Sequence, residues 1–130
     1  MISKNTAINI FDQWALSGRD RGMESGHSKS VRRMFQILIK NYFKSKDEFS
    51  ALDLGCGNGW MIRELSSYFR NIKGVGLDGS KNMINKAKEI DPHGNYICKD
   101  INQWNPDTKF NLIISMEVIY YLDDPHRILD

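Results

Sequence analysis

The sequence predicts an α/β protein with a Rossmann-like, doubly wound parallel sheet and additional helices at its N-terminus. From about residue 50 onward, short apolar runs alternate with stretches in which apolar residues recur every three or four positions. This alternation is typical of strands that are separated by helices. One of the short runs leads directly into a glycine-rich turn and then into a helical stretch. A helix between two strands carries the chain back to the end of the sheet at which the first strand began. We therefore expect the strands to be parallel, with right-handed crossovers.

The composition is that of one soluble globular domain. The chain has 130 residues, of which 41% are hydrophobic and 26% charged, and its formal charge is +2. This charge is too small for a dedicated nucleic-acid-binding protein. No apolar run approaches the ~20 residues that a helix needs to cross a bilayer, and the two cysteines lack the spacing of a metal site. We therefore expect a cytoplasmic protein that binds no nucleic acid, membrane or metal.

The N-terminal segment, residues 1–48, is predicted to be helical. Apolar residues from Ala7 to Leu16 follow helical spacing. Residues 17–30 contain three glycines and charges of both signs without periodicity, so we expect a loop there. A second helix, with a core-facing apolar stripe, is expected from residue 31 to near Lys44.

Residues 49–130 are predicted to form the cofactor-binding half of the same single domain. The expected elements share short lengths and apolar cores, and the last run is apolar almost throughout, as in a strand that is covered on both faces. In order, they are a strand at Ala51–Leu54, a helix at Gly59–Phe69, a strand at Lys73–Leu77, a helix capped by Ser80 that ends before Pro92, a strand at Asn95–Lys99 and a strand at Phe110–Met116.

The glycine-rich turn after the first strand is the clearest candidate for a ligand site. Residues 51–60 read ALDLGCGNGW, in which Gly55, Gly57 and Gly59 form a GxGxG pattern. Glycine permits positive φ and lets backbone approach a ligand, and the following helix offers free N–H groups. Trp60 stands where the dinucleotide fingerprint has its third glycine, and the Gly-Lys-Ser/Thr ending of a phosphate loop is absent. The turn therefore favours a nucleotide-like ligand of another kind.

Three acidic residues stand at or near the ends of three successive strands. Asp53 lies just before the glycine turn, where a carboxylate favours a cationic ligand over a pyrophosphate. Asp78 ends the second strand, where doubly wound sheets place an acid that accepts the ribose hydroxyls. Asp100 follows the third strand. Because parallel strands end at one edge of the sheet, we expect the three acids to face one crevice.

In this order the motifs resemble those of the class I S-adenosylmethionine-dependent methyltransferases. The resemblance is carried by LDLGCGNG, GVGLDGSKNMINKAKE, ICKDINQW and FNLIISMEVIYYLDD, from about residue 50 to about residue 128. It implies the strand order 3-2-1-4 and S-adenosylmethionine as the cofactor. The cofactor-binding residues that it implies are Asp53 bracing the turn, Gly55, Cys56, Gly57 and Gly59 in the turn beside the methionine, Asp78 at the ribose, Gly79 and Met83 beside the adenine, Asp100 and Ile101 at the adenine edge, and Met116 and Glu117 near the methyl group.

The chain departs from this family pattern in two ways. Asn111 stands where the fourth motif usually has an acid, at the start of a strand and away from the cofactor. The chain also stops at Asp130, whereas the sheet of the family has seven strands. We therefore expect either a truncated portion of a longer methyltransferase or a protein that covers the edge of its fourth strand by self-association.

The implied reaction is methyl transfer to a small-molecule acceptor, driven chiefly by positioning. Two residues are candidates for contacts with the acceptor. The resemblance implies that the N-terminal segment, residues 1–48, is a lid over the cofactor and the acceptor. His27 of this segment is a candidate base, the alternative being a solvated loop residue, and Tyr120 follows the fourth strand. Two other functions stay open: a nonenzymatic cofactor-binding fragment or partner subunit, and a nicotinamide-dependent oxidoreductase.

Overall fold

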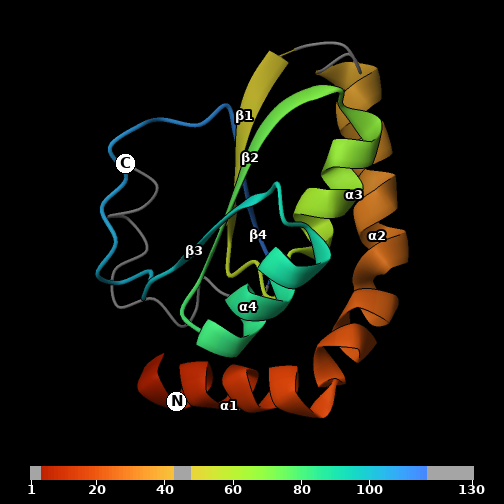
Figure 1. The fold of residues 1–130 in the computed structure, drawn as a ribbon. Helices are drawn as coiled ribbons and strands as arrows, with labels where there is room; N and C mark the ends of the chain where they lie inside the picture. The colour runs from red at the N-terminus through yellow and green to blue at the C-terminus, as the bar shows by residue number, and fades with distance from the viewer. Residues whose placement is uncertain (1–3, 43–47, 117–130) are drawn as a thin grey trace.

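The computed structural model describes residues 4–42 and 48–116, which form a parallel sheet with a layer of helices against it (Figure 1). The elements in chain order are α1 (Lys4–Ser17), α2 (Arg19–Asn41), β1 (Glu48–Leu54), α3 (Trp60–Tyr68), β2 (Asn71–Asp78), α4 (Lys81–Ile90), β3 (Asn95–Cys98) and β4 (Leu112–Ser115). In the described ranges, no helix is long and apolar enough to cross a membrane.

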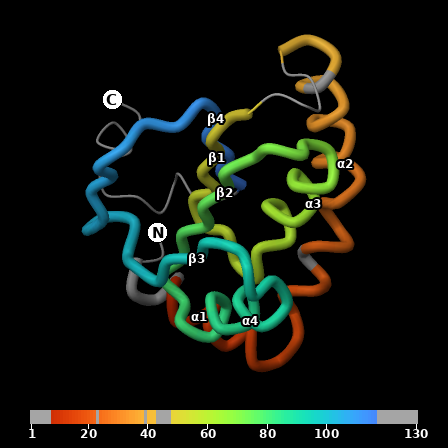
Figure 2. Tube along the Cα trace, turned by 45° about the horizontal axis from the view of Figure 1, so that its top comes forward, coloured from red at the N-terminus to blue at the C-terminus, as the bar shows by residue number. Residues whose placement is uncertain are grey.

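The sheet has the order β3-β2-β1-β4 and all its strands are parallel, which confirms the predicted fold class (Figure 2). The chain adds β2 and β3 on one side of β1 and then returns to add β4 on the other side. The order of strands therefore reverses at β1, and doubly wound sheets bind their ligands at such a switch point. In this register Leu54 pairs with Leu77 of β2 and Ser115 of β4, so the carboxyl ends of the three strands lie together.

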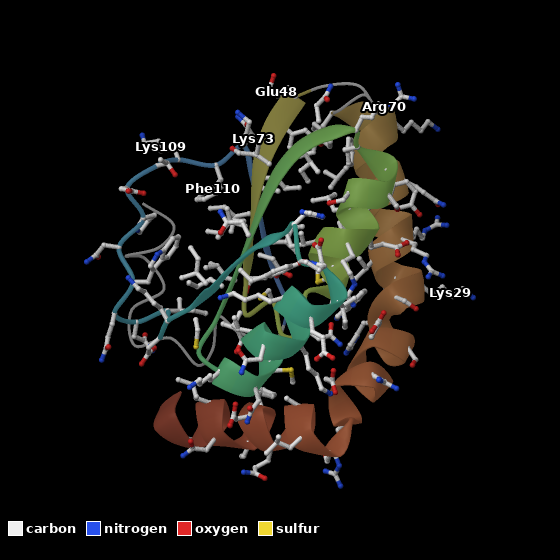
Figure 3. All side chains as sticks on the ribbon, viewed as in Figure 1. Lys29, Glu48, Arg70, Lys73, Lys109 and Phe110 are labelled. Atoms are coloured by element: carbon white, nitrogen blue, oxygen red, sulfur yellow. The ribbon has the colours of Figure 1, made fainter. Side chains whose placement is uncertain are left out.

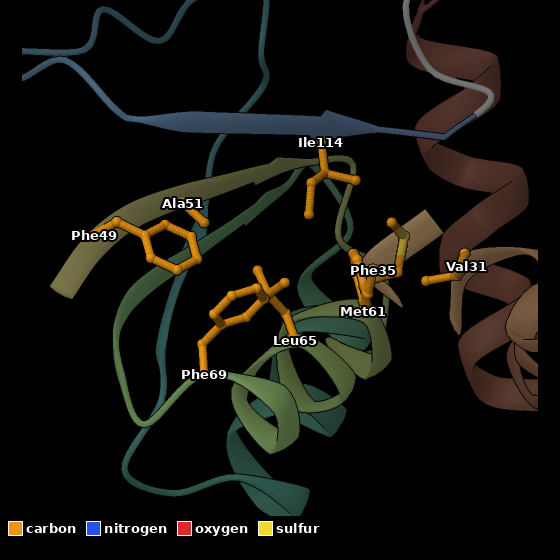
Figure 4. Close-up of a cluster of buried hydrophobic side chains, with 8 residues drawn as sticks. All are labelled: Val31, Phe35, Phe49, Ala51, Met61, Leu65, Phe69 and Ile114. Carbon is orange, nitrogen blue, oxygen red and sulfur yellow. The ribbon is translucent and has the colours of Figure 1, made fainter. Parts of the chain in front are cut away.

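The main core fills the space between the sheet and the helices. Eight buried residues from α2, β1, α3, the residue after α3, and β4 form one cluster: Val31, Phe35, Phe49, Ala51, Met61, Leu65, Phe69 and Ile114 (Figure 4). The rings of Phe49 and Phe69 meet edge to face, with centroids 4.8 Å apart. Because α2 contributes two of these residues, the apolar stripe predicted from residue 31 onward is what holds it against α3.

The opposite face of the sheet is covered by a connection without a helix in the described residues. Leu52, Leu54 and Leu77 form a second apolar cluster there with Ile101, and Trp104 and Phe110 pack against it. Figure 3 shows Phe110 turned toward the sheet and Lys109 turned away. The strand expected at 110–116 spans Leu112–Ser115, and Ile113 is 41% exposed, so burial on both faces does not hold along the described part of β4.

The loop predicted at residues 17–30 is wrong, because α2 begins at Arg19 and continues unbroken to Asn41. Only Gly18, in the left-handed conformation at φ 82°, interrupts the helices. Residues 19–30 lack an apolar stripe because this part of α2 packs through polar contacts. Asp20 accepts hydrogen bonds from Asn58 and Lys86, and Glu24 lies 3.9 Å from Arg63. Tertiary contacts therefore decide the helix where local periodicity gives no signal.

The two ends of the sheet differ in what covers them. At the amino ends of β1 and β2, Glu48 and Lys73 form an exposed ion pair at 3.2 Å (Figure 3). At the carboxyl ends, α1 lies across the molecule and packs against α4 (Figure 1). The end of the sheet where doubly wound folds bind ligands is therefore the end that the N-terminal helix covers.

Candidate cofactor site

The glycine-rich turn between β1 and α3 is bound directly to the end of β2. The backbone N–H groups of Gly55 and Cys56 both donate to the carbonyl oxygen of Leu77, at 2.7 and 3.0 Å. Gly55, Gly57 and Gly59 have φ values of 76°, 55° and 83°. A side chain at any of these φ values is strained, so the three glycines allow the chain to turn this tightly before α3 begins.

Two of the glycines face different surroundings. A Cβ atom on Gly57 would meet only the sulfur of Met83, at 3.9 Å, so the backbone of Gly57 borders open space beside Met83. A Cβ atom on Gly59 would lie 2.7 Å from the ring of Tyr96. Gly57 is therefore the position at which backbone can approach a ligand, whereas Gly59 is required for packing against Tyr96.

Asp78 joins the turn to the start of α4. Its Oδ2 accepts the backbone N–H of Gly57 at 2.9 Å, and its Oδ1 accepts the backbone N–H of Ser80 at 2.8 Å. Burial raises the pKa of this carboxyl, and the two hydrogen bonds partly offset the rise. A carboxylate has about four acceptor sites, so Asp78 can accept further hydrogen bonds from hydroxyl groups such as those of a ribose.

Asp53 lies in β1, directly beneath this turn. Its carboxyl is 1% exposed, and neither oxygen has a hydrogen-bond partner among the residues that the structure describes. Burial, and then the negative charge of Asp78, raises its pKa to about 7. Because a buried carboxylate without a partner is unfavourable, a positively charged group beside the turn would stabilise the ionised form. The turn, Asp53 and Asp78 thus fit a cofactor that carries hydroxyl groups and a positive charge.

Three other residues expected at the cofactor lie near the turn or at the end of β3. Met83 is buried in the first turn of α4 and faces Gly57. Cys56 points into a core cluster with Ile84 and Tyr96, where burial, followed by the charge of Asp53, raises the pKa of its thiol, so only its backbone is available to a ligand. Asp100 lies beyond the end of β3 and accepts the backbone N–H of Asn102.

Three more expected residues lie on different surfaces. The position of a Cβ atom on Gly79 would be 2.7 Å from Ile8, so α1 covers this residue. Ile101 is buried in the cluster on the opposite face of the sheet, and Met116 packs against the main core cluster beyond β4. His27 lies half-buried on α2 instead of in a loop. Glu117 and Tyr120 lie outside the described residues.

Two carboxylates of the N-terminal helices, Asp12, which is half-buried, and Asp20, which is buried, were not anticipated from the sequence. Asp12 of α1 accepts hydrogen bonds from the Ser80 hydroxyl at 2.6 Å and the Asn82 backbone at 2.9 Å, which lower its pKa. Asp20 of α2 accepts hydrogen bonds from Asn58 in the turn and from Lys86, both at 2.8 Å. Burial raises the pKa of Asp20, but these bonds outweigh it and the pKa is lowered. The one local feature that pointed to such a contact was Asn58, a polar residue between two glycines of the turn, which is the partner of Asp20.

Comparison with known proteins matches residues 51–130 to the family described as "Methyltransferase domain". The chain belongs to this family. It is 34% identical over 89 residues to malonyl-[acyl-carrier protein] O-methyltransferase 1 of Ilyobacter polytropus, which covers 66% of this chain and 33% of that protein. It is 39% identical over 75 residues to trans-aconitate 2-methyltransferase of Yersinia pestis, covering 57% and 29%.

Solved structures of methyltransferases share the fold. A Haloferax volcanii methyltransferase, solved in complex with the Trm112 activator, is 31% identical and superposes with a TM-score of 0.72, covering 92% of this chain and 52% of that one. The plantazolicin methyltransferase BpumL, solved with SAH, is 22% identical with a TM-score of 0.64, covering 95% and 51%. The predicted family and fold are confirmed. The chain spans about a third of the length of the curated relatives that it matches.

Proposed function

We propose that this protein transfers a methyl group from S-adenosylmethionine to a small-molecule acceptor. The observation that carries the proposal is the junction of the glycine turn with Asp78, where Gly57 donates its N–H to the carboxylate at 2.9 Å. This junction lies at the carboxyl ends of β1 and β2, and Asp53 is buried beneath it. Membership of the methyltransferase-domain family supports the same reaction.

S-adenosylmethionine supplies an electrophilic methyl group on a positively charged sulfur. Asp78 would accept the ribose hydroxyls, because its two existing bonds leave acceptor sites free and fix its orientation. Asp53 would place a negative charge beside the cationic part of the cofactor. α1, whose Ile8 covers Gly79, would exclude water from the adenosine side. The contribution of these residues is binding and positioning, and His27 stays the candidate base.

We propose further that the acceptor is a small carboxylic acid. Two relatives are named for a malonyl group and for trans-aconitate, both of which are acids. Residues 1–50 carry nine Lys and Arg against five Asp and Glu, and two of those acids, Asp12 and Asp20, are engaged in internal hydrogen bonds. The N-terminal segment therefore offers excess positive charge to an anionic acceptor.

A methyl-transfer assay with isotopically labelled S-adenosylmethionine tests both statements. The acceptors are malonyl-loaded carrier protein, trans-aconitate and, as a neutral control, the dimethyl ester of malonate. We expect label in an acid-derived methyl ester and none with the neutral control. The Asp78→Ala variant should lose transfer at limiting cofactor. Cofactor binding without transfer to any acceptor would favour the nonenzymatic alternative, and transfer to the neutral control alone would refute an acidic acceptor.

A further inference from the structure

We infer that Asp20 is a positioning residue for the cofactor site, through its hydrogen bond to Asn58 in the glycine turn. The inference rests on the proposed function, because it assigns the turn to the cofactor. It makes the N-terminal helices a part of the cofactor site that determines its affinity.

The contact between α2 and the turn is buried. Asp20 lies in the first turn of α2 and is 5% exposed, and Asn58 is 2% exposed. Oδ2 of Asp20 accepts from Nδ2 of Asn58, and Oδ1 accepts from Nζ of Lys86, both at 2.8 Å. Hydrogen bonds to a buried carboxylate are stronger than those between neutral groups.

Asn58 is held on its other sides by the start of α3. Its Oδ1 accepts the backbone N–H of Trp60 at 3.1 Å, and its carbonyl oxygen accepts from the guanidinium of Arg63. Arg63 in turn lies 3.9 Å from Glu24 of α2. The side-chain nitrogen of Asn58 donates to Asp20 while its side-chain oxygen accepts the first backbone N–H of α3, so without Asp20 a buried N–H group would be left without its acceptor.

A chain of hydrogen bonds leads from Asp20 to the predicted ribose-binding acid. Asn58 is bonded covalently to Gly57, whose N–H donates to Asp78, and Asp78 accepts the N–H of Ser80. The Ser80 hydroxyl donates to Asp12 of α1. The two N-terminal helices therefore hold the turn and Asp78 from both sides, and a shift of Asn58 would be transmitted to the N–H of Gly57.

The alternative is that Asp20 only fastens α2 to α4 through Lys86. An exchange of the two partners separates these roles. Asn58→Asp places two carboxylates together and should weaken binding of S-adenosylhomocysteine about tenfold or more. The double variant Asp20→Asn, Asn58→Asp restores one amide and one carboxylate, and it should return the affinity to within about threefold of wild type.

Calorimetric titration with S-adenosylhomocysteine, together with melting temperatures, provides the test. Lys86→Met keeps the Asp20 to Asn58 bond and should keep the affinity, and so should Arg32→Gln, which removes the exposed α2 to α3 ion pair with Glu64. A folded double variant that binds no better than Asn58→Asp would overturn the inference. If Asn58→Asp fails to fold, Asp20→Ala and Lys86→Met decide: equal losses of affinity overturn the inference, and a loss in Asp20→Ala alone supports it. Failure of the wild-type protein to bind would instead refute the proposed function.

Discussion

Asp53 gives the protein a pH dependence of stability that a single substitution should remove. The folded protein holds this carboxyl at a pKa of about 7, against the ordinary value of 3.8. Between these two pH values the folded state keeps a proton that the unfolded chain has lost, so the free energy of unfolding falls as the pH rises through this window. A shift of about three pKa units corresponds to about 4 kcal/mol, and the loss is complete above about pH 7.

The perturbation is Asp53→Asn, and the assay is urea denaturation at pH 5 and pH 8. About two of the three pKa units lie between these conditions, so the wild-type free energy of unfolding should be about 3 kcal/mol lower at pH 8 than at pH 5. In Asp53→Asn the part of this difference that comes from Asp53 should disappear. At pH 8 the variant should be more stable by about 1–3 kcal/mol, because the buried amide still lacks partners and offsets part of the gain.

Other carboxyls do not account for a difference in pH dependence between the wild type and Asp53→Asn. The pKa values of Asp12 and Asp20 are lowered, so their contribution to stability is lost as the pH falls below the ordinary carboxyl range and has the opposite sign. The pKa of Asp78 is raised, so Asp78 adds to the decline with pH in both proteins. Equal pH dependence in wild type and Asp53→Asn would refute the assignment of an unpartnered buried acid to Asp53.

Four further outcomes are expected. Asp78→Ala should weaken S-adenosylhomocysteine binding by roughly 1.5–3 kcal/mol, about 10- to 100-fold, whereas Asp107→Ala, on an exposed turn, should leave it unchanged; equal affinities would misplace the ribose. Binding of S-adenosylmethionine near pH 7 should release a proton from Asp53, measured by calorimetry in buffers of different ionisation enthalpy, and no release would contradict the cationic contact. Asp12→Ala should lower the free energy of unfolding by about 1–2 kcal/mol in a urea titration, because the start of α4 loses its carboxylate, and an unchanged midpoint would contradict this. In the part of the chain that the structure describes, β4 is an edge strand and Ile113 is 41% exposed; we predict that a second copy pairs with this edge, so light scattering should show concentration-dependent association that Ile113→Lys weakens, and a monomer at all concentrations would refute this.

The fold was predictable because its signals are local. Apolar runs and helical spacing lie within short windows, and they gave the strands and the parallel order, while Ser80 was recognised as the cap of α4 and accepts the N–H of Met83 as expected. The start of α2 was not predictable in this way. Its first turns are held by Asp20, whose partners Asn58 and Lys86 lie 38 and 66 positions away.

The site was predictable only in part, for a similar reason. Glycine spacing and the positions of acids at strand ends indicated the turn, Asp53 and Asp78, which the structure places side by side. No local pattern indicated that Asp12 lies against Ser80, because 68 positions separate them. Residues such as Ile101 were carried over from the family pattern, and their roles at the cofactor stay predictions.

Two calorimetric titrations under identical conditions, one with S-adenosylhomocysteine and one with NAD, test most directly whether the carboxyl ends of β1 and β2 bind S-adenosylmethionine. We expect one site with micromolar affinity for S-adenosylhomocysteine and no heat from NAD. At a ligand concentration of 100 times Kd, S-adenosylhomocysteine should add roughly 2.7 kcal/mol to the free energy of unfolding. Binding of NAD without binding of S-adenosylhomocysteine would contradict the assignment of this site to S-adenosylmethionine.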